Sequence, residues 1–146
     1  MELKSSVLIV DDCEDMLEIE KIFIERYCGS EAIAARSFDE LKKLGDKILD
    51  CKLAFLDLNF GESEPTGIEI YHWLKKKGFA NPIFFLTGNG ANSDLAVEVE
   101  QLGEGTLLTK PIVPALFTKL VEDPSSAFKP RNNPFTHFKS KNSSHP

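Results

Sequence analysis

Four apolar residues, Leu53 to Leu56, run directly into a carboxylate at Asp57. A continuous apolar run without alternation is typical of a strand that is buried on both faces of a sheet. A carboxylate at the end of such a strand is costly to remove from water unless a cation, hydrogen-bond donors or solvent meet it. The run therefore predicts a central strand whose aspartate lies at the edge of the sheet, where another group offsets its charge.

Three other short apolar runs end in polar residues in the same way. Residues 7–10 lead into Asp11 and Asp12, residues 83–86 into Thr87, and residues 106–109 into Lys110. Helical periodicity between the runs predicts an α/β fold, a doubly wound parallel sheet of five strands with helices on both faces. The carboxyl ends of parallel strands share one edge, where ligands bind in open α/β sheets.

Apolar spacing and turn residues place the individual elements. Strands are expected at 5–10, 31–37, 53–59, 83–87 and 106–109, although the second is rich in alanine, which is not a strand former. Helices are expected at 14–28, 38–49 with a break at Gly45, 68–77, 94–102 and 111–121. The first helix should bury Met16, Ile19, Phe23 and Tyr27, with Leu17 and Ile24 beside them. Ser37 and Glu40 form the Ser-x-x-Glu pattern of a capping box.

Charge and cysteine content argue against several classes of protein. The net charge is −6, and residues 1–123 alone hold 13 basic and 23 acidic residues. Such an acidic domain argues against DNA binding by the folded part. No stretch resembles a signal peptide or a membrane span. The three cysteines, an odd number without metal-type spacing, indicate free thiols in a reducing cytosol, and hence a cytoplasmic protein.

The composition changes at Pro124. Residues 1–123 are expected to form one domain, and residues 124–146 form a basic tail rich in Pro, Ser and Asn. A mostly disordered terminal extension is the favoured interpretation. Three phenylalanines among the lysines could alternatively dock onto a partner, onto the acidic domain or weakly onto nucleic acid.

The polar residues at the strand ends suit one kind of chemistry. Several carboxylates favour a hard cation such as Mg²⁺, whereas a hydroxyl and a lysine suit phosphoryl oxygens. A carboxylate can itself be the nucleophile that accepts a phosphoryl group. Each residue alone has an ordinary explanation as a turn or cap residue. Their joint occurrence favours phosphoryl transfer to Asp57.

The chain resembles the receiver domain of two-component response regulators in four segments, which occur in the same order as in that family: residues 7–12, 56–59, 83–87 and 110–111. The resemblance covers roughly residues 5–121 and implies a flavodoxin-like sheet with strand order 2-1-3-4-5. It implies a bacterial, stand-alone, chemotaxis-regulator-like phosphoprotein, since no output domain follows. Its partners would be a sensor histidine kinase or a histidine phosphotransfer protein, and a downstream protein target.

The resemblance also implies residue roles. Asp57 would accept the phosphoryl group, and Thr87 and Lys110 would hold its oxygens. Mg²⁺ would be bound directly by Asp12 and Asp57 and by the backbone carbonyl of Asn59, and chiefly through water by Asp11. The domain would be a phosphoacceptor rather than an enzyme, apart from slow autodephosphorylation.

Three positions depart from the family pattern. The loop 60–67 is about two residues longer than usual, which surface loops tolerate. Leu107 replaces the usual Tyr or Phe that acts as a switch with the threonine, and Gly88 replaces a common alanine.

The sequence leaves two other functions to consider beside phosphoryl acceptance. The long loop and Leu107 favour a phosphorylation-independent interaction module with the same fold. A metal-dependent hydrolase with an aspartate nucleophile is disfavoured because Asn59 stands where such phosphatases have a second, acidic aspartate.

Overall fold

The computed structural model describes residues 5–60, 64–88, 94–103, 106–110 and 112–124. Within these residues the chain forms a parallel five-stranded sheet of order β2-β1-β3-β4-β5, which confirms the predicted fold class and strand order. The strands are β1 (Ser6–Val10), β2 (Glu31–Ala35), β3 (Cys51–Asp57), β4 (Ile83–Thr87) and β5 (Thr106–Thr109).

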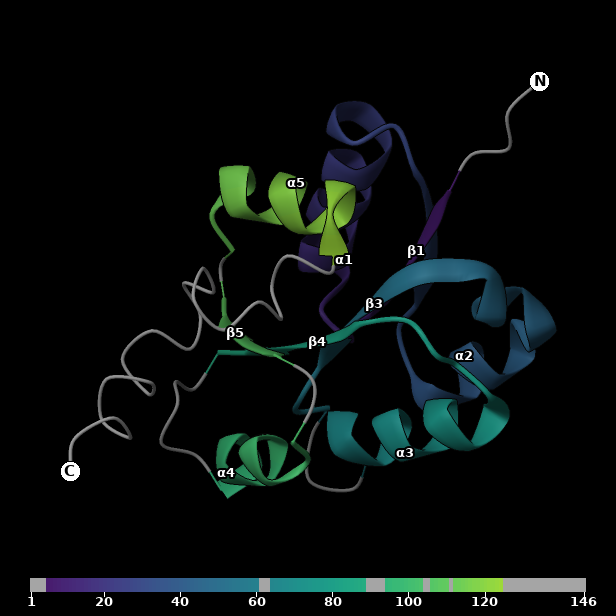
Figure 1. Cartoon of the computed structure of the whole chain (residues 1–146), viewed down its shortest axis with the longest axis vertical. Coiled ribbons are helices and arrows are strands. Elements are labelled where there is room, and N and C mark those ends of the chain that lie inside the picture. The colour runs from purple at the N-terminus through teal and green to yellow at the C-terminus, as the bar shows by residue number, and fades with distance from the viewer. Residues whose placement is uncertain (1–4, 61–63, 89–93, 104–105, 111, 125–146) are drawn as a thin grey trace, which may run out of the picture.

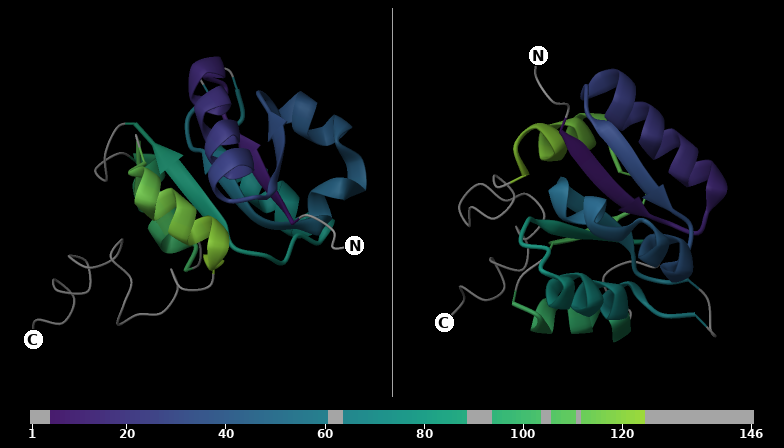
Figure 2. Two further views of the ribbon diagram at one scale, coloured as in Figure 1. Left: turned by 90° about the horizontal axis from the view of Figure 1, so that it is seen from above. Right: turned by 90° about the vertical axis from the view of Figure 1, so that its right-hand side faces the viewer.

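Helices alternate with the strands. They are α1 (Glu14–Ile22), α2 (Phe38–Lys43), α3 (Gly67–Lys77), α4 (Asp94–Gln101) and α5 (Pro114–Glu122). A π-helical segment, η1 (Phe23–Tyr27), continues α1, and a 3-10 helix, η2 (Gly45–Asp50), follows α2. Helices α1 and α5 cover one face of the sheet, and α2, α3 and α4 cover the other (Figures 1 and 2).

The two faces of β3 explain why its sequence is apolar without alternation. Leu53 and Phe55 pack on the side of α1 and α5, while Ala54 and Leu56 pack in the second core cluster on the opposite side. All four side chains are completely buried. A strand in this position must be apolar at every residue, so its first polar side chain, Asp57, marks the point where the chain leaves the core.

Helix α1 and its continuation η1 bury a different stripe from the predicted one. Leu17, Glu20 and Ile24 are buried, whereas Ile19 is 47% exposed and Tyr27 is 66% exposed. The prediction that Ile19 and Tyr27 face the core was therefore wrong. The apolar residues of this helix form two overlapping stripes, and only packing against the sheet decides which of them is covered.

The ends of α1 and α5 also differ from the expected ones. Helix α1 ends at Ile22 and continues as η1, at whose end the backbone N–H of Cys28 donates to the carbonyl of Phe23 at 3.1 Å, which is the spacing of a π-helix. The last helix begins at Pro114 rather than at Pro111. Val113 is extended, with φ −62° and ψ 129°, because the residue before a proline is disfavoured in the helical conformation.

Helix α2 has only half of the predicted capping box. The backbone N–H of Glu40 donates to the Ser37 hydroxyl at 3.1 Å, as expected. The Glu40 carboxylate instead accepts from the backbone N–H of Arg36 at 2.8 Å. Helix α3 has a complete box, between Thr66 and Glu69.

Several expectations fall on parts of the chain that the structure does not describe. These are the middle of the loop 60–67, the turn after Gly88 and nearly all of the tail 124–146. Among the described helices, none is both long and apolar enough to span a membrane.

Candidate functional site

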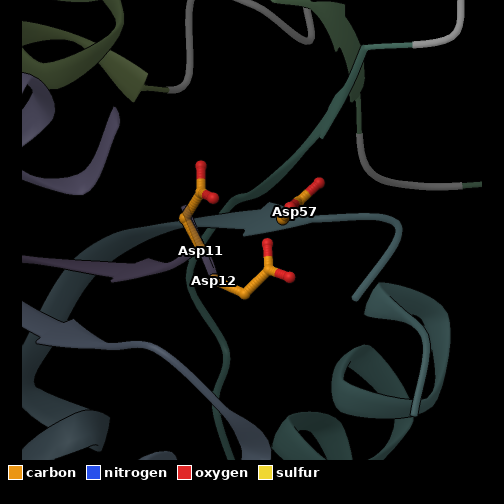
Figure 3. Close-up of side chains that lie close together, drawn as sticks. All are labelled: Asp11, Asp12 and Asp57. Atoms are coloured by element: carbon orange, nitrogen blue, oxygen red, sulfur yellow. The ribbon is translucent and has the colours of Figure 1, made fainter. Parts of the chain in front are cut away.

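Three carboxylates meet at the carboxyl ends of β1 and β3. One oxygen from each of Asp11, Asp12 and Asp57 lies within 4.8 Å of the others, and Figure 3 shows the three side chains around one space. Asp11 is completely buried and Asp57 is 5% exposed, while Asp12 is exposed. The parallel pairing of β1 with β3 places these chain segments side by side. This cluster of three residues is called the aspartate cluster below.

Lys110 brings a cation into the aspartate cluster. Its Nζ lies 2.9 Å from Asp11 Oδ2 and 3.4 Å from Asp57 Oδ2. The backbone N–H of Lys110 donates to the carbonyl of Thr87 at 2.8 Å, so the chain after β5 stays beside the end of β4. Thr87 itself is buried at that end, next to the strand that carries Asp57. The ammonium group therefore offsets the buried negative charge, as the position of Asp57 predicted.

Backbone N–H groups hold two of the carboxylates in place. Asp11 Oδ1 accepts from the N–H of Cys13 at 2.9 Å, and Asp57 Oδ1 accepts from the N–H of Asn59 at 3.4 Å. In both cases the side chain bonds the backbone two residues later, as in an Asx-turn. These two hydrogen bonds fix one oxygen of each carboxylate at the end of its strand.

Burial and charge act on Asp57 in opposite directions. Burial raises the pKa of its carboxyl, Lys110 lowers it and Asp11 raises it again, with a net pKa of about 6. For Lys110, burial alone would lower the pKa, but Asp11 and Asp57 raise the pKa of the ammonium above its usual range. At neutral pH the site therefore holds an ionised Asp57 beside a charged Lys110.

The residues of the cluster fit a hard divalent cation. All the available donors are oxygens, and an ion such as Mg²⁺ prefers one or two carboxylates together with water. The exposed side chain of Asp12 leaves one side open to solvent, where such waters can bind. A dication would also relieve the repulsion from Asp11 and Asp12 that raises the pKa of Asp57.

Gly67 allows helix α3 to begin directly against the end of β3. A methyl group at this position would collide with the carbonyl oxygen of Asp57 and lie 3.0 Å from Leu58 Cα. The N–H of Gly67 donates to the carbonyl of Leu58 at 2.9 Å. This hydrogen bond and the close approach of Gly67 hold the start of α3 against the end of β3.

The remaining predicted positions have plain structural settings. Asn59 is exposed, and its backbone is tied to Asp57. Leu107 pairs with Phe85 in the sheet and packs, half-buried, on the core between the sheet and α2, α3 and α4. Of the three cysteines, Cys13 is exposed, Cys28 half-buried and Cys51 buried, and none forms a disulfide.

Glu20 is an acidic residue near the site that sequence reasoning missed. It lies on α1 and is 3% exposed. Burial raises the pKa of its carboxyl, and the charges of Asp11, Lys110 and Asp57 also act on that pKa. A signal was available, because positions 17, 20 and 24 have the spacing of one helix face. Because a glutamate in the middle of a helix face is usually exposed, the prediction assigned the buried face to Met16, Ile19, Phe23 and Tyr27 instead.

Comparison with known proteins points to one family. The family model described as "Response regulator receiver domain" matches residues 7–122. No curated protein sequence matches the chain.

Solved structures of receiver domains are similar in fold. A CheY-like receiver domain protein from Methanospirillum hungatei has a TM-score of 0.71 at 21% identity, covering 88% of this chain and 99% of that one. Chemotaxis protein CheY4 from Vibrio cholerae has a TM-score of 0.69 at 21% identity, and the match covers 82% of this chain and 98% of that one. A receiver domain protein from Clostridium thermocellum has a TM-score of 0.67 at 21% identity, and the match covers 85% of this chain and 98% of that one. The family match spans most of the chain and these structures share its fold, so the chain belongs to the family of response regulator receiver domains.

Proposed function

We propose that this receiver domain accepts a phosphoryl group on Asp57 in a Mg²⁺-dependent reaction. The donor would be a sensor histidine kinase or a histidine phosphotransfer protein. The observation that carries the proposal is the position of Lys110 Nζ, 3.4 Å from Asp57 Oδ2 and beside three clustered carboxylates. A nucleophile, a cation for phosphoryl oxygens and a metal-binding set are thereby within reach of one another.

Asp57 would act as the nucleophile. A bond forms from its carboxylate oxygen to phosphorus while the bond from phosphorus to the donor nitrogen breaks, and the electron pair leaves with that nitrogen. With a pKa of about 6, Asp57 is largely ionised at pH 7.5 and more basic than an ordinary aspartate. Burial that raises the pKa therefore strengthens the nucleophile without neutralising it.

The other residues would bind and orient. Asp11, Asp12 and Asp57, with the backbone carbonyl of Asn59, would hold Mg²⁺, which when bound supplies positive charge to the phosphoryl oxygens. Lys110 would exchange part of its contact with Asp11 and Asp57 for the phosphoryl group. Thr87, buried at the end of β4, would bind another phosphoryl oxygen. These roles account for the polar residues at the ends of β1, β3, β4 and β5.

The output would be a changed interaction with a downstream protein. Phosphorylation at the carboxyl ends of the strands would shift an equilibrium in α4, β5 and α5, the elements that follow Thr87 in the chain. We assign residues 1–123 to the receiver domain and 124–146 to an appended basic tail on composition.

An intact-mass measurement tests the phosphoacceptor assignment. The full chain is incubated with Mg²⁺ and acetyl phosphate, and the wild type should gain the mass of one phosphoryl group. Asp57→Asn should gain none, whereas Asp39→Asn, a change of an exposed aspartate on α2, should behave as the wild type. Unchanged phosphorylation of Asp57→Asn would show that Asp57 is not the acceptor.

A second candidate function is a phosphorylation-independent interaction module, which Leu107 favours. An aliphatic, half-buried side chain at this position offers no aromatic group to move with Thr87. Amide NMR spectra with Mg²⁺ and a fluoride-based phosphoryl mimic distinguish the two functions. Trp73 is a poor reporter, because its ring packs on Phe38 at 5.4 Å and under Lys77 rather than on the aspartate cluster. Shifts confined to the cluster would favour the passive module, and shifts that extend through α4 and β5 would favour the switch.

A further inference from the structure

The outer side of α1 and η1 carries apolar side chains that the sheet and α5 leave uncovered. Ile19 is 47% exposed, Ile22 is 45% exposed and Tyr27, whose ring packs on Phe23 at 5.5 Å, is 66% exposed. Apolar side chains gathered on one face indicate an interaction surface, whereas single exposed ones are ordinary. Together with their exposed acidic neighbours they are called the α1 outer face below, which consists of Asp15, Glu18, Ile19, Ile22, Glu25 and Tyr27.

The charge around these apolar residues is mainly negative. Outside the core, residues 14–27 carry two basic side chains, Lys21 and Arg26, and four acidic ones, Glu14, Asp15, Glu18 and Glu25. Glu18 pairs with Lys21 at 3.5 Å, and Glu14 pairs with Arg36 at 3.1 Å. Both ion pairs are exposed, and exposed pairs contribute little, so these carboxylates can accept other partners. A second copy of the chain would bring like charges against this face, which disfavours self-association through it. The α1 outer face therefore fits a segment that is both basic and apolar.

The chain itself supplies a segment of this kind. Residues 125–146, which lie outside the described residues, carry four basic residues and no acidic one. They also hold three phenylalanines, and two of these, Phe128 and Phe138, are followed directly by a lysine. A phenylalanine beside a lysine complements an apolar residue beside a carboxylate, as in Glu18 and Ile19. Composition thus matches this segment to the α1 outer face in both hydrophobicity and charge.

The segment also leaves the domain beside the α1 outer face. Helices α1 and α5 follow parallel strands and cover the same face of the sheet, so their carboxyl ends lie at the same edge (Figure 2). Phe117 of α5 packs on Phe23 of η1 with ring centroids 6.0 Å apart, and Cys28 packs in the same core cluster as Leu120. The chain from Pro124 to residue 138 can extend to about 45 Å. The nine residues of α1 and the five of η1 span only about 20 Å, which is well within that reach.

We propose that residues 125–146 fold back onto the α1 outer face of the same molecule. The phenylalanines pack on Ile19, Ile22 and Tyr27, and the lysines and arginine lie beside the acidic side chains. A weak contact is enough, because a short tether gives an effective concentration in the millimolar range. The contact requires neither Mg²⁺ nor a phosphoryl group, so it stands apart from the proposed function. A protein that binds the α1 outer face would have to displace the segment first.

Methyl NMR of the isoleucine-labelled full chain tests this contact. The wild type is compared with the triple variant Phe128→Ser/Phe135→Ser/Phe138→Ser. We expect the methyl resonances of Ile19 and Ile22 to shift in the variant, because aromatic rings displace the resonances of methyl groups that pack on them. Nuclear Overhauser contacts from phenylalanine ring protons of the segment to these methyl groups should be present in the wild type and lost in the variant.

Two matched controls accompany this comparison. The variant Asn132→Ser/Asn133→Ser/Asn142→Ser changes three polar residues of the same segment and should leave the methyl resonances as in the wild type. In the reverse direction, Ile19→Ser should shift the amide resonances of the three phenylalanines. Val97→Ser on α4 should not, although Val97 is 46% exposed, nearly as much as Ile19.

Each remaining outcome decides against the proposal. Methyl resonances of Ile19 and Ile22 that coincide in the wild type and the triple phenylalanine variant would overturn it, as would equal effects of Ile19→Ser and Val97→Ser. A wild-type spectrum that changes on tenfold dilution would show that the segment binds a second copy instead. Shifts of the same size at Ile70 and Ile83, which are buried in the core cluster on the opposite side of the sheet, would show a change in domain packing rather than a lost contact.

Discussion

Replacing the buried Glu20 with glutamine should stabilise the protein, and increasingly so as the pH rises. The pKa of Glu20 is about 8 in the folded chain against an ordinary value of 4.5. Between these two values the folded state binds more protons than the unfolded state, so the free energy of unfolding falls with rising pH. Below 4.5 the carboxyl is protonated in both states, and above 8 it is ionised in both, so the dependence lies between them.

The magnitude follows from the two pKa values. Integrating the proton difference from pH 5 to pH 8 gives a loss of about 3 to 4 kcal/mol that belongs to Glu20 alone. This is a large fraction of the 5–15 kcal/mol, roughly, by which domains are usually stable. Glutamine has nearly the shape of the protonated acid but does not ionise, so Glu20→Gln should keep that free energy at pH 8.

Urea unfolding at several pH values, followed by circular dichroism in metal-free buffer, tests this prediction. The quantity of interest is the difference between Glu20→Gln and wild type, because the decline caused by the raised pKa of Asp57 cancels in it. Glu18→Gln, an exposed change on the same helix, should show no such trend. A difference that stays constant within about 1 kcal/mol from pH 5 to pH 8 would refute the reasoning, since one pKa unit corresponds to about 1.4 kcal/mol.

Three further changes have expected results. Gly67→Ala should lower the free energy of unfolding by about 1–3 kcal/mol in urea titrations, because the added methyl group collides with the backbone of β3. Lys110→Met should raise the pKa of Asp57 further, measured by NMR of the labelled carboxyl, and should slow phosphorylation by acetyl phosphate at pH 6.5. Ser37→Ala should cost about 1 kcal/mol of stability through loss of the α2 cap, with m-values unchanged. A pKa of Asp57 that falls in Lys110→Met would contradict the ion-pair geometry.

The sequence by itself determined the sheet and the place of the aspartate cluster. The apolar runs before Asp11, Asp57 and Thr87 are continuous because a central parallel strand is covered on both faces. Their polar residues could therefore stand only at the strand ends, and in a parallel sheet those ends share one edge. The position of these residues along the chain was enough to predict that they meet.

Only the tertiary structure decided what the helices bury and how the charges pair. Along α1 and η1, Glu20 faces the core while Ile19 and Tyr27 remain exposed, since the sheet and α5 cover one of two possible stripes. Lys110 Nζ lies closer to Asp11 Oδ2, at 2.9 Å, than to Asp57 Oδ2, at 3.4 Å, a difference that the strand pattern of the sequence does not contain. Local sequence encodes a periodicity, but burial and charge–charge distance depend on segments far apart in the chain. The raised pKa of Glu20, for example, arises from burial and from charges on segments that the fold brings together.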